Sequence, residues 1–347
     1  MEGIFAAVTT PFYDDDRVYF EKLESNMARY SRSLLAGMLV LGSTGEAVML
    51  DDAESRDVLR VAAEATAPEK VLVAGVGRES VKATVALAEA AAQYQYDAVL
   101  VRPPSYFAPQ MSSAAVLHYF RSVADRSPLP VILYNIPKFV PYQIPIEMVA
   151  ELAQHPNIIA MKDSSGSVER IHAAVASTAN APRRTVPVTQ DFEAVTARML
   201  APGALQTPDD VMSAGKLPRG AAVASAPPAK ARSSEAGFQI LTGSERIILP
   251  SLQAGASGAI LAFADFAPQA CHEIYQAWSS QAMALAEEKQ RRIVSAGKRI
   301  VGELGISGIK YACDFNGYYG GQGRTPLLRL TAEERTEIER LLGGIRS

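Results

Sequence analysis

Eight short apolar runs recur along the chain, and between consecutive runs lies a segment able to form a helix. This alternation constrains the fold more than any other feature of the sequence. Strands that alternate with helices form parallel βαβ units, and eight such units favour a closed (β/α)₈ (TIM) barrel over an open doubly wound sheet. The predicted strands are Ile4–Thr9, Met38–Leu41, Val71–Gly75, Ala98–Val101, Val131–Tyr134, Ile158–Met161, Gln239–Leu241 and Ala259–Ala262.

The segments between the runs carry the start signals of helices. Asp51 is followed three residues later by Glu54, which is the pattern of a capping box. Further N-cap residues stand at Ser80, Ser112 and Ser167. The predicted helices include Ala53–Ala65, Val81–Ala92, Ala114–Ala124, Ile146–Ala153 and Val168–Ser177.

Residues 181–236 interrupt the alternation between the sixth predicted helix and the seventh predicted strand. They hold seven of the chain's 21 prolines, a composition typical of an irregular surface insertion. Because helix-to-strand connections lie at the N-terminal face of a barrel, we expect the insertion to lie away from the chemistry. The predicted organisation is therefore a catalytic barrel over residues 1–265, interrupted at about 181–236, and a C-terminal helical region over residues 266–347.

Composition excludes several classes of protein. The chain has 34 Lys and Arg against 37 Asp and Glu, whereas a nucleic-acid-binding protein would carry a clear basic excess. The uncharged stretch Ile247–Ala264 is broken by Pro250, Gly255 and Gly258, which argues against a membrane span. The first residues lack the basic segment of a signal peptide, so we expect a cytoplasmic protein. Two cysteines and four histidines lack metal-ligand spacing, so no metal site is expected.

Chemistry in such a barrel lies where the strands end, so the residues after each predicted strand are the candidates. The second strand leads into Gly42-Ser43-Thr44-Gly45-Glu46. Two glycines around two hydroxyl residues let backbone N–H groups converge on an anion, to which the side chains add donors. The same residues also suit an ordinary turn.

Tyrosines follow the fourth and fifth predicted strands. Tyr106 belongs to the loop Pro103–Phe107, which two prolines stiffen, and its ring serves either packing or chemistry. Tyr134 ends the fifth strand, where a tyrosine is either a hydrogen-bonded core residue or a proton donor.

Lys162 ends the sixth predicted strand at its last inward position. An ammonium group inside an apolar barrel is costly unless it is paired, so burial favours the neutral amine. A neutral amine attacks carbonyl groups and forms Schiff bases. The alternative is a lysine at the rim that reaches water or pairs with Asp163.

Taken together, three motifs in this order and at these intervals resemble the dihydrodipicolinate synthase / N-acetylneuraminate lyase family of pyruvate-dependent class I aldolases. They are Gly42–Glu46 after the second strand, Tyr134–Pro137 after the fifth and Lys162–Ser164 after the sixth. The resemblance covers nearly the whole chain outside the insertion. Within the family, the pattern is most similar to the 4-hydroxy-2-oxoglutarate aldolases.

The resemblance implies a role for each matching residue. Lys162 matches the Schiff-base lysine, and Tyr134 matches the tyrosine that shuttles protons. Ser43 matches a hydroxyl of the proton relay, and Thr44 matches the residue that holds the pyruvate carboxylate together with Ser43. Ile260 matches a backbone contact to the pyruvyl group.

The resemblance also implies partners. Tyr106 matches a relay tyrosine that members of the family often lend across a dimer contact, so a homodimer or homotetramer is expected. The substrates would be a 2-oxo acid, pyruvate, and an aldehyde. The covalent imine on Lys162 is an electron sink in itself, so no cofactor and no metal is expected.

One position departs from the family pattern. Dihydrodipicolinate synthases usually have an arginine shortly after the fifth-strand motif, where this chain has Phe139 next to Lys138. Phe139 cannot bind a carboxylate in the bidentate way of an arginine. This favours 4-hydroxy-2-oxoglutarate-type cleavage, with dihydrodipicolinate synthase as the alternative enzyme and a non-catalytic 2-oxo-acid-binding barrel as the alternative of another class. Arg102 and Arg246 are candidates for binding a distal carboxylate.

Overall fold

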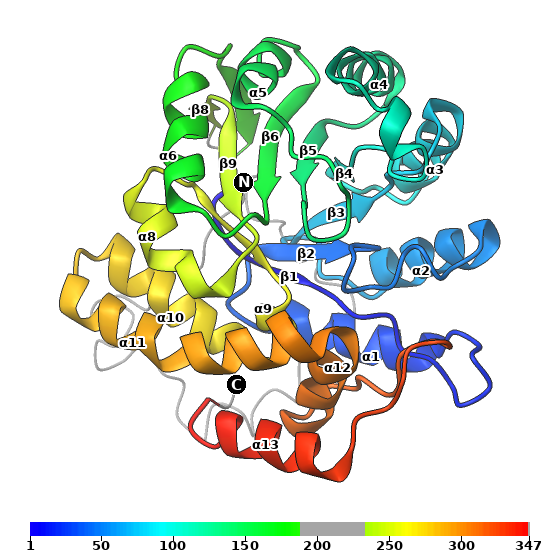
Figure 1. Cartoon of the computed structure of the whole chain (residues 1–347), viewed down its shortest axis with the longest axis vertical. Coiled ribbons are helices and arrows are strands. Elements are labelled where there is room, and N and C mark those ends of the chain that lie inside the picture. Colours follow the sequence, from blue (N-terminus) through cyan, green and yellow to red (C-terminus); the bar gives the residue numbers. More distant parts are fainter. Residues whose placement is uncertain (188–232, 346–347) are drawn as a thin grey trace, which may run out of the picture. The chain divides into compact units, whose positions relative to one another are not determined.

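The computed structural model describes residues 1–187 and 233–345, and its centre is a closed barrel of eight parallel strands (Figure 1). Each of the eight predicted strands is present, and β1 pairs with β10 to close the barrel. The (β/α)₈ prediction is therefore confirmed. The barrel strands are β1 (Gly3–Ala7), β2 (Gly37–Val40), β3 (Val71–Gly75), β4 (Ala98–Val101), β5 (Val131–Asn135), β6 (Ile158–Asp163), β9 (Gln239–Thr242) and β10 (Gly258–Leu261).

Helices follow the strands at the predicted places. The capping box is formed as expected, because Asp51 Oδ1 accepts from the Glu54 N–H at 2.8 Å and Glu54 Oε2 accepts from the Asp51 N–H at 3.0 Å. The helices between strands are α1 (Phe20–Ser31), α2 (Asp52–Glu64), α3 (Val81–Gln93), α4 (Ser113–Arg126), α5 (Ile146–Leu152), α6 (Val168–Ser177) and α8 (Ile248–Gln253), with short 3₁₀ turns η1 (Ala108–Gln110) and η3 (Glu245–Ile247).

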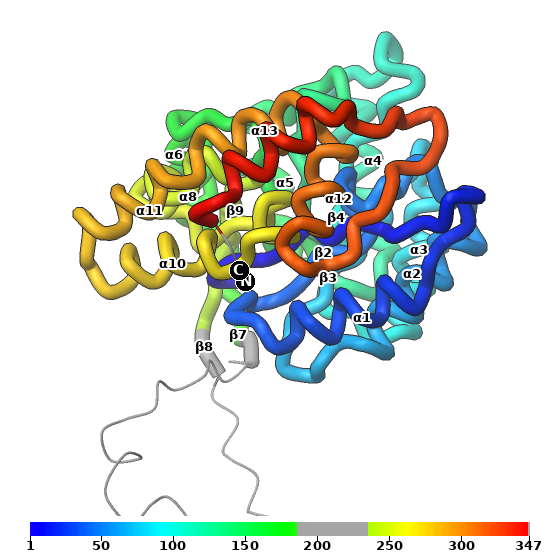
Figure 2. The backbone as a smooth tube through the Cα atoms, turned by 90° about the horizontal axis from the view of Figure 1, so that it is seen from below, coloured from blue at the N-terminus to red at the C-terminus, as the bar shows by residue number. Residues whose placement is uncertain are grey.

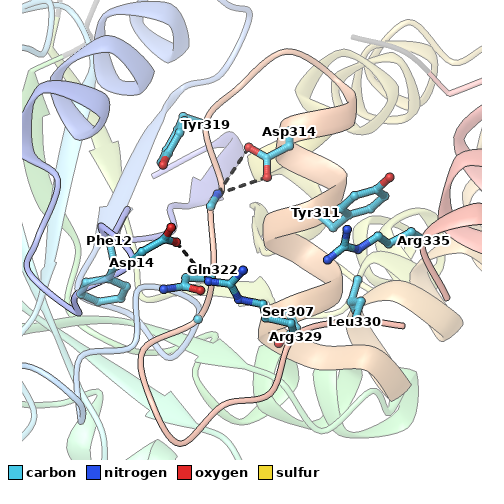
Figure 3. A pocket seen from close by; sticks show the side chains of 12 residues that line it. Phe12, Asp14, Ser307, Tyr311, Asp314, Tyr319, Gln322, Arg329, Leu330 and Arg335 are labelled. Atoms are coloured by element: carbon cyan, nitrogen blue, oxygen red, sulfur yellow. Dashed lines mark hydrogen bonds and ion pairs between the residues drawn. The ribbon is translucent and has the colours of Figure 1, made fainter. Parts of the chain in front are cut away.

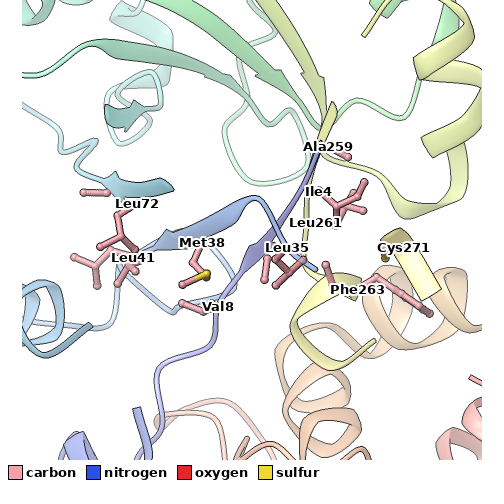
Figure 4. Close-up of a cluster of buried hydrophobic side chains, with 14 of the residues drawn as sticks. Ile4, Val8, Leu35, Met38, Leu41, Leu72, Ala259, Leu261, Phe263 and Cys271 are labelled. Carbon is pink, nitrogen blue, oxygen red and sulfur yellow. The ribbon is translucent and has the colours of Figure 1, made fainter. Parts of the chain in front are cut away.

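Side chains alternate between two buried layers along each strand. Phe5 and Ala7 of β1 pack in a cluster inside the barrel, whereas Ile4 and Ala6 pack in the layer between the strands and the helices. Figure 4 shows part of that outer layer, including Ile4. Because both faces of the strands are covered, the strand sequences are largely apolar, with polar residues mainly at their ends, and they therefore stand out as apolar runs in the sequence.

The C-terminal region is helical except at short connections and in a longer loop formed by residues 316–331. Here the prediction of helix throughout is wrong, because Gly317 and Gly321 adopt positive φ values of 87° and 67°, which a helix does not contain. Figures 1 and 2 show this region beside the barrel, with α13 next to α12. Its elements are α9 (Phe263–Phe266), α10 (Pro268–Ser279), α11 (Met283–Ala296), the π-helix η4 (Gly297–Leu304), α12 (Gly305–Phe315) and α13 (Ala332–Leu342).

The chain divides into two compact units, residues 1–183 with 237–347, and residues 184–236. In the second unit, β7 (Arg184–Pro187) pairs antiparallel with β8 (Ser233–Ala236). Most of the predicted insertion lies outside the described residues, so its placement away from the chemistry stays a prediction. No helix in the described part of the chain is long and apolar enough to cross a membrane.

A buried carboxyl group joins the C-terminal region to the first strand and helix. Asp265 of α9 is fully buried and accepts hydrogen bonds from the Tyr30 hydroxyl at 2.6 Å and from the Thr9 N–H at 3.1 Å. The Cys313 thiol of α12 donates to it at 3.4 Å. All three donors are uncharged, and burial raises the pKa of the Asp265 carboxyl from 3.8 to about 6.

Asp265→Asn should change how stability depends on pH. Because the folded state holds the Asp265 proton more tightly than the unfolded chain, this group stabilises the fold below about pH 4, and the stabilisation is lost as pH rises through about 6. The full shift in the pKa of Asp265 corresponds to about 3 kcal/mol of folding free energy. Urea denaturation of both proteins from pH 4 to pH 8 should show the variant gaining stability relative to wild type as pH rises. A difference that stays constant with pH would contradict the assignment.

Candidate active site

Lys162 and Tyr134 lie side by side at the carboxyl ends of neighbouring strands. They are register partners in β6 and β5, and both are almost completely buried, with 4% and 6% of their surfaces exposed. Lys162 Nζ lies 4.5 Å from the centroid of the Tyr134 ring. The two residues that the sequence singled out separately are thus in direct contact, with the amine on the face of the phenol ring.

The burial of Lys162 bears on the alternative of a rim lysine. The alternative of a rim lysine paired with Asp163 is wrong, because Lys162 is buried and Asp163 is paired elsewhere. Asp163 Oδ2 accepts from Arg170 Nε at 2.7 Å and from Asn135 Nδ2 at 2.8 Å. Among the described residues, no carboxylate pairs with Lys162.

Gly243 adds a constraint that the sequence analysis missed. It directly follows β9, and a Cβ atom there would lie 3.2 Å from Lys162 Cε and only 2.0 Å from Ser164 Oγ. A side chain at this position would collide with the residues around the amine. The available signal was a glycine directly after a predicted barrel strand, at the end where chemistry lies.

Ser43 and Thr44 lie in the loop after β2. The Ser43 carbonyl accepts from the Glu46 N–H at 3.1 Å, and the Gly45 carbonyl accepts from the Thr10 hydroxyl at 2.7 Å. These bonds fix the loop, whereas the hydroxyls of Ser43 and Thr44 make no hydrogen bond to any described residue. The two hydroxyls are therefore available to a ligand.

Glu46, the last residue of that loop, forms a buried ion pair with Lys310 of α12. Lys310 Nζ lies 2.6 Å from Glu46 Oε1, and both side chains are completely or almost completely buried. Lys310 also donates to the Gln322 carbonyl at 2.7 Å, and the Arg324 N–H donates to Glu46 Oε2 at 2.8 Å. Burial lowers the pKa of Lys310, and the Glu46 carboxylate opposes that shift. The sequence analysis gave no role to Lys310.

The remaining two predicted site residues, Ile260 and Tyr106, lie in opposite environments, one buried and one exposed. Ile260 is fully buried in β10 and belongs to the same interior cluster as Tyr134. Tyr106 is 81% exposed, its ring packs edge-on against Phe107, and its N–H donates to Glu79. The Tyr106 hydroxyl makes no hydrogen bond within the described part of the chain, so the predicted relay is not assembled from this chain alone.

The candidate carboxylate binders differ in their availability. Arg102 is paired with Glu79 at 2.9 Å and also donates to nearby loop atoms. Arg246 is exposed and has no ion pair with a described residue. Lys138 Nζ donates to a backbone carbonyl of η4 at 2.8 Å, and Phe139 beside it is 58% exposed. Of these cations, Arg246 alone has no hydrogen bond or ion pair with the residues that the structure describes.

A cavity of about 260 Å³ lies outside the predicted site (Figure 3). Its wall includes Asp14 and Arg329, which form an ion pair of 3.1 Å, and Tyr311 of α12. Gln322, whose carbonyl accepts from Lys310, also lines it. Lys162 and Tyr134 do not line it, so it is separate from the contact between the amine and the phenol.

The family is identified by comparison with known proteins. The model of the dihydrodipicolinate synthetase family matches residues 1–186 and 229–344. The chain therefore belongs to the dihydrodipicolinate synthetase family, as the three motifs predict. It is a lyase of the aldolase and synthase type.

Relatives named for different activities match nearly the whole chain. The L-threo-3-deoxy-hexylosonate aldolase of Hypocrea jecorina is 29% identical over 99% of this chain and 95% of its own length. The probable mitochondrial 4-hydroxy-2-oxoglutarate aldolase of Emericella nidulans is 28% identical over 97% of this chain and 92% of its own length. The 4-hydroxy-tetrahydrodipicolinate synthase of Methanothrix thermoacetophila is 24% identical over 98% of this chain and 95% of its own length.

Solved structures support the fold. The crystal structure of a dihydrodipicolinate synthase from Bacillus anthracis superposes with a TM-score of 0.79, covering 100% of this chain and 99% of that chain at 22% identity. Because the superposition covers the whole of this chain, it supports the (β/α)₈ fold for the surrounding helices as well as for the strands.

The ion pair between Glu46 and Lys310 gives a stability prediction. Lys310→Met leaves the Glu46 carboxylate buried without its partner, which should cost about 3–5 kcal/mol of folding free energy. The double variant Glu46→Gln with Lys310→Met removes both charges, so it should lose clearly less. Urea denaturation of the wild type, both single variants and the double variant measures this coupling. If the double variant loses as much folding free energy as the two single variants together, the two groups do not stabilise one another.

Proposed function

We propose that this chain is a Schiff-base aldolase that splits a 4-hydroxy-2-oxo acid of the 4-hydroxy-2-oxoglutarate type into pyruvate and an aldehyde, and also runs the reverse reaction. The observation that carries the proposal is the buried Lys162 amine, which touches Tyr134 and has no carboxylate partner among the described residues.

The proposed reaction starts at Lys162. Its amine adds to the 2-oxo carbon of the substrate, and loss of water gives a protonated imine. The bond between C3 and C4 then breaks, and its electron pair moves into the imine to form an enamine. The C4 hydroxyl loses its proton as the aldehyde forms. Protonation of the enamine at C3 and hydrolysis of the imine release pyruvate and the free lysine.

Tyr134 is the group positioned for the proton transfers of this scheme. Its ring contacts the Lys162 amine, which supports a role for its hydroxyl in moving protons to and from the imine-bound substrate. Thr44 and Ser43 would hold the carboxylate of the 2-oxo acid, because their hydroxyls make no hydrogen bond to a described residue. Ile260 of the interior cluster would contact the pyruvyl group.

Tyr106 fits a role that needs a second copy of the chain. Its ring is mostly exposed, and its hydroxyl has no partner among the described residues. A homodimer or homotetramer in which this tyrosine enters the neighbouring relay would use that exposure. No metal or organic cofactor enters the proposed reaction, because the imine itself accepts the electron pair. A cytoplasmic location stays a prediction.

The choice of an aldolase over a synthase rests on Phe139 and on the relatives. Phe139 stands where a synthase would present its carboxylate-binding arginine, and Lys138 is bonded to η4 instead. The two relatives named as aldolases are 28% and 29% identical, against 24% for the synthase. Arg246 is available to bind a distal carboxylate of the substrate.

Lys162→Ala should abolish covalent trapping of pyruvate. Incubation of the wild type with pyruvate and borohydride should add one reduced pyruvyl group, and peptide mapping should place it on Lys162. Lys298→Ala, which removes an exposed lysine, is the matched control and should trap as the wild type does. An adduct on another lysine, or none in the wild type, would overturn the proposed chemistry.

Substrate preference separates the aldolase from the synthase. The value of kcat/KM for cleavage of 4-hydroxy-2-oxoglutarate, or of a related 4-hydroxy-2-oxo acid, should exceed that for condensing pyruvate with aspartate semialdehyde. Phe139→Arg should raise the synthase activity, because it restores a fork for the second carboxylate. Phe139→Leu is the uncharged control and should not raise it. A wild-type preference for aspartate semialdehyde would favour the synthase instead.

A further inference from the structure

Arg324 lies in the loop of residues 316–331 and binds separate parts of the chain. Its Nη1 donates to the Met49 carbonyl at 2.8 Å and to Glu54 Oε2 at 2.7 Å. Its Nε donates to the Asp16 carbonyl at 3.1 Å. The side chain is only 14% exposed, so the guanidinium joins the C-terminal loop to the segments that follow β1 and β2.

The main chain of Arg324 reaches the loop that carries Ser43 and Thr44. The Arg324 N–H donates to Glu46 Oε2 at 2.8 Å, and the Glu46 N–H donates to the Ser43 carbonyl at 3.1 Å. Met49, whose carbonyl accepts from the guanidinium, donates its own N–H to the Glu46 carbonyl at 2.7 Å. The backbone and the side chain of Arg324 therefore both act on Glu46, the last residue of that loop.

Two residues of the loop after β2 have strained backbones. Leu41 and Glu46, which flank residues 42–45, adopt φ values of 59° and 55°, in the left-handed region that costs a non-glycine residue about 1–3 kcal/mol. Such conformations persist only where surrounding contacts hold them. At Glu46 these contacts are the N–H of Arg324 and the amine of Lys310. The shape of this loop thus depends in part on the C-terminal region.

We propose that Arg324 is a positioning residue for binding the carboxylate of the 2-oxo acid. Its guanidinium fixes the loop of residues 316–331, and its N–H then holds Glu46 and the shape of the loop that presents Ser43 and Thr44. The proposal rests on the proposed function of these two hydroxyl residues as binders of the carboxylate. Arg324 acts through Glu46 and does not itself touch the substrate.

The test measures borohydride trapping over a range of pyruvate concentrations. In Arg324→Gln the pyruvate concentration for half-maximal labelling should rise about tenfold, the effect of weakening a hydrogen bond to a charged group. The maximal rate of labelling should stay within about twofold of the wild type, because Lys162 stands on a strand that Arg324 does not contact. Arg324→Lys keeps the charge without the fork, so it should restore part of the loss.

A ketone without a carboxylate separates positioning from general damage to the fold. Hydroxyacetone uses the same amine, so its half-maximal concentration should be equal in Arg324→Gln and in the wild type. Arg329→Gln is the matched control, because Arg329 is an exposed arginine of the same loop that pairs with Asp14. This control should trap pyruvate as the wild type does.

Two results would overturn the proposal. One is an unchanged pyruvate concentration in folded Arg324→Gln, and the other is an equal loss for pyruvate and hydroxyacetone. If Arg324→Gln does not fold, Glu54→Gln decides, because it removes the ion pair and keeps an acceptor for the helix cap. In that variant the half-maximal concentration of pyruvate should rise about threefold, whereas that of hydroxyacetone should not change.

Lactate keeps this proposal separate from the proposed function. It carries the carboxylate of pyruvate but no carbonyl group, so its affinity by calorimetry reports carboxylate binding without any imine. Wild-type protein that binds lactate but never traps pyruvate would remove the imine chemistry, and weaker lactate binding in Arg324→Gln would still support the role of Arg324. Normal trapping in the wild type, with pyruvate and lactate affinities unmoved in Arg324→Gln, would remove that role and leave the function intact.

Discussion

The burial of the Lys162 amine inside the barrel is the constraint on which the rest of this site depends. An ammonium group in that position would need a counter-ion, and none of the described residues supplies one. The neighbouring Tyr134 ring contributes the partial negative charge of its face, which is a weaker interaction than a carboxylate would give. A nucleophilic amine can be maintained only while nearby carboxylates stay paired with other groups.

Two buried carboxylates at the ends of barrel strands are paired with cations. Asp163 is paired with Arg170, and Glu46 is paired with Lys310 at 2.6 Å, so each of these carboxylates has its own cation. The helical region after the barrel supplies Lys310. This region therefore neutralises Glu46 in the loop that carries Ser43 and Thr44, and it also covers apolar surface.

The sequence predicted the barrel because its strands are buried on both faces and leave eight apolar runs, and it predicted Lys162 and Tyr134 because strand ends are where such barrels carry chemistry. It could not predict the partners of the charged residues. Lys310 lies far along the chain from Glu46, and the choice of Arg170 over Lys162 as the partner of Asp163 depends on which face of β6 each side chain occupies. Chain segments that meet only through tertiary packing leave no periodic pattern to read.

The proposed function divides chemistry and specificity between different parts of the molecule. Lys162 and Tyr134 stand on strands, whereas Phe139 stands on the loop after β5 and is largely exposed. That loop is fixed at two points, by the bond from Lys138 to η4 and by the bond from Arg170 to its last part. A substitution at Phe139 can therefore change which aldehyde fits without moving the strands that hold the amine. Under the proposed function, one barrel can serve different aldehydes, because loops that vary on a constant scaffold carry specificity.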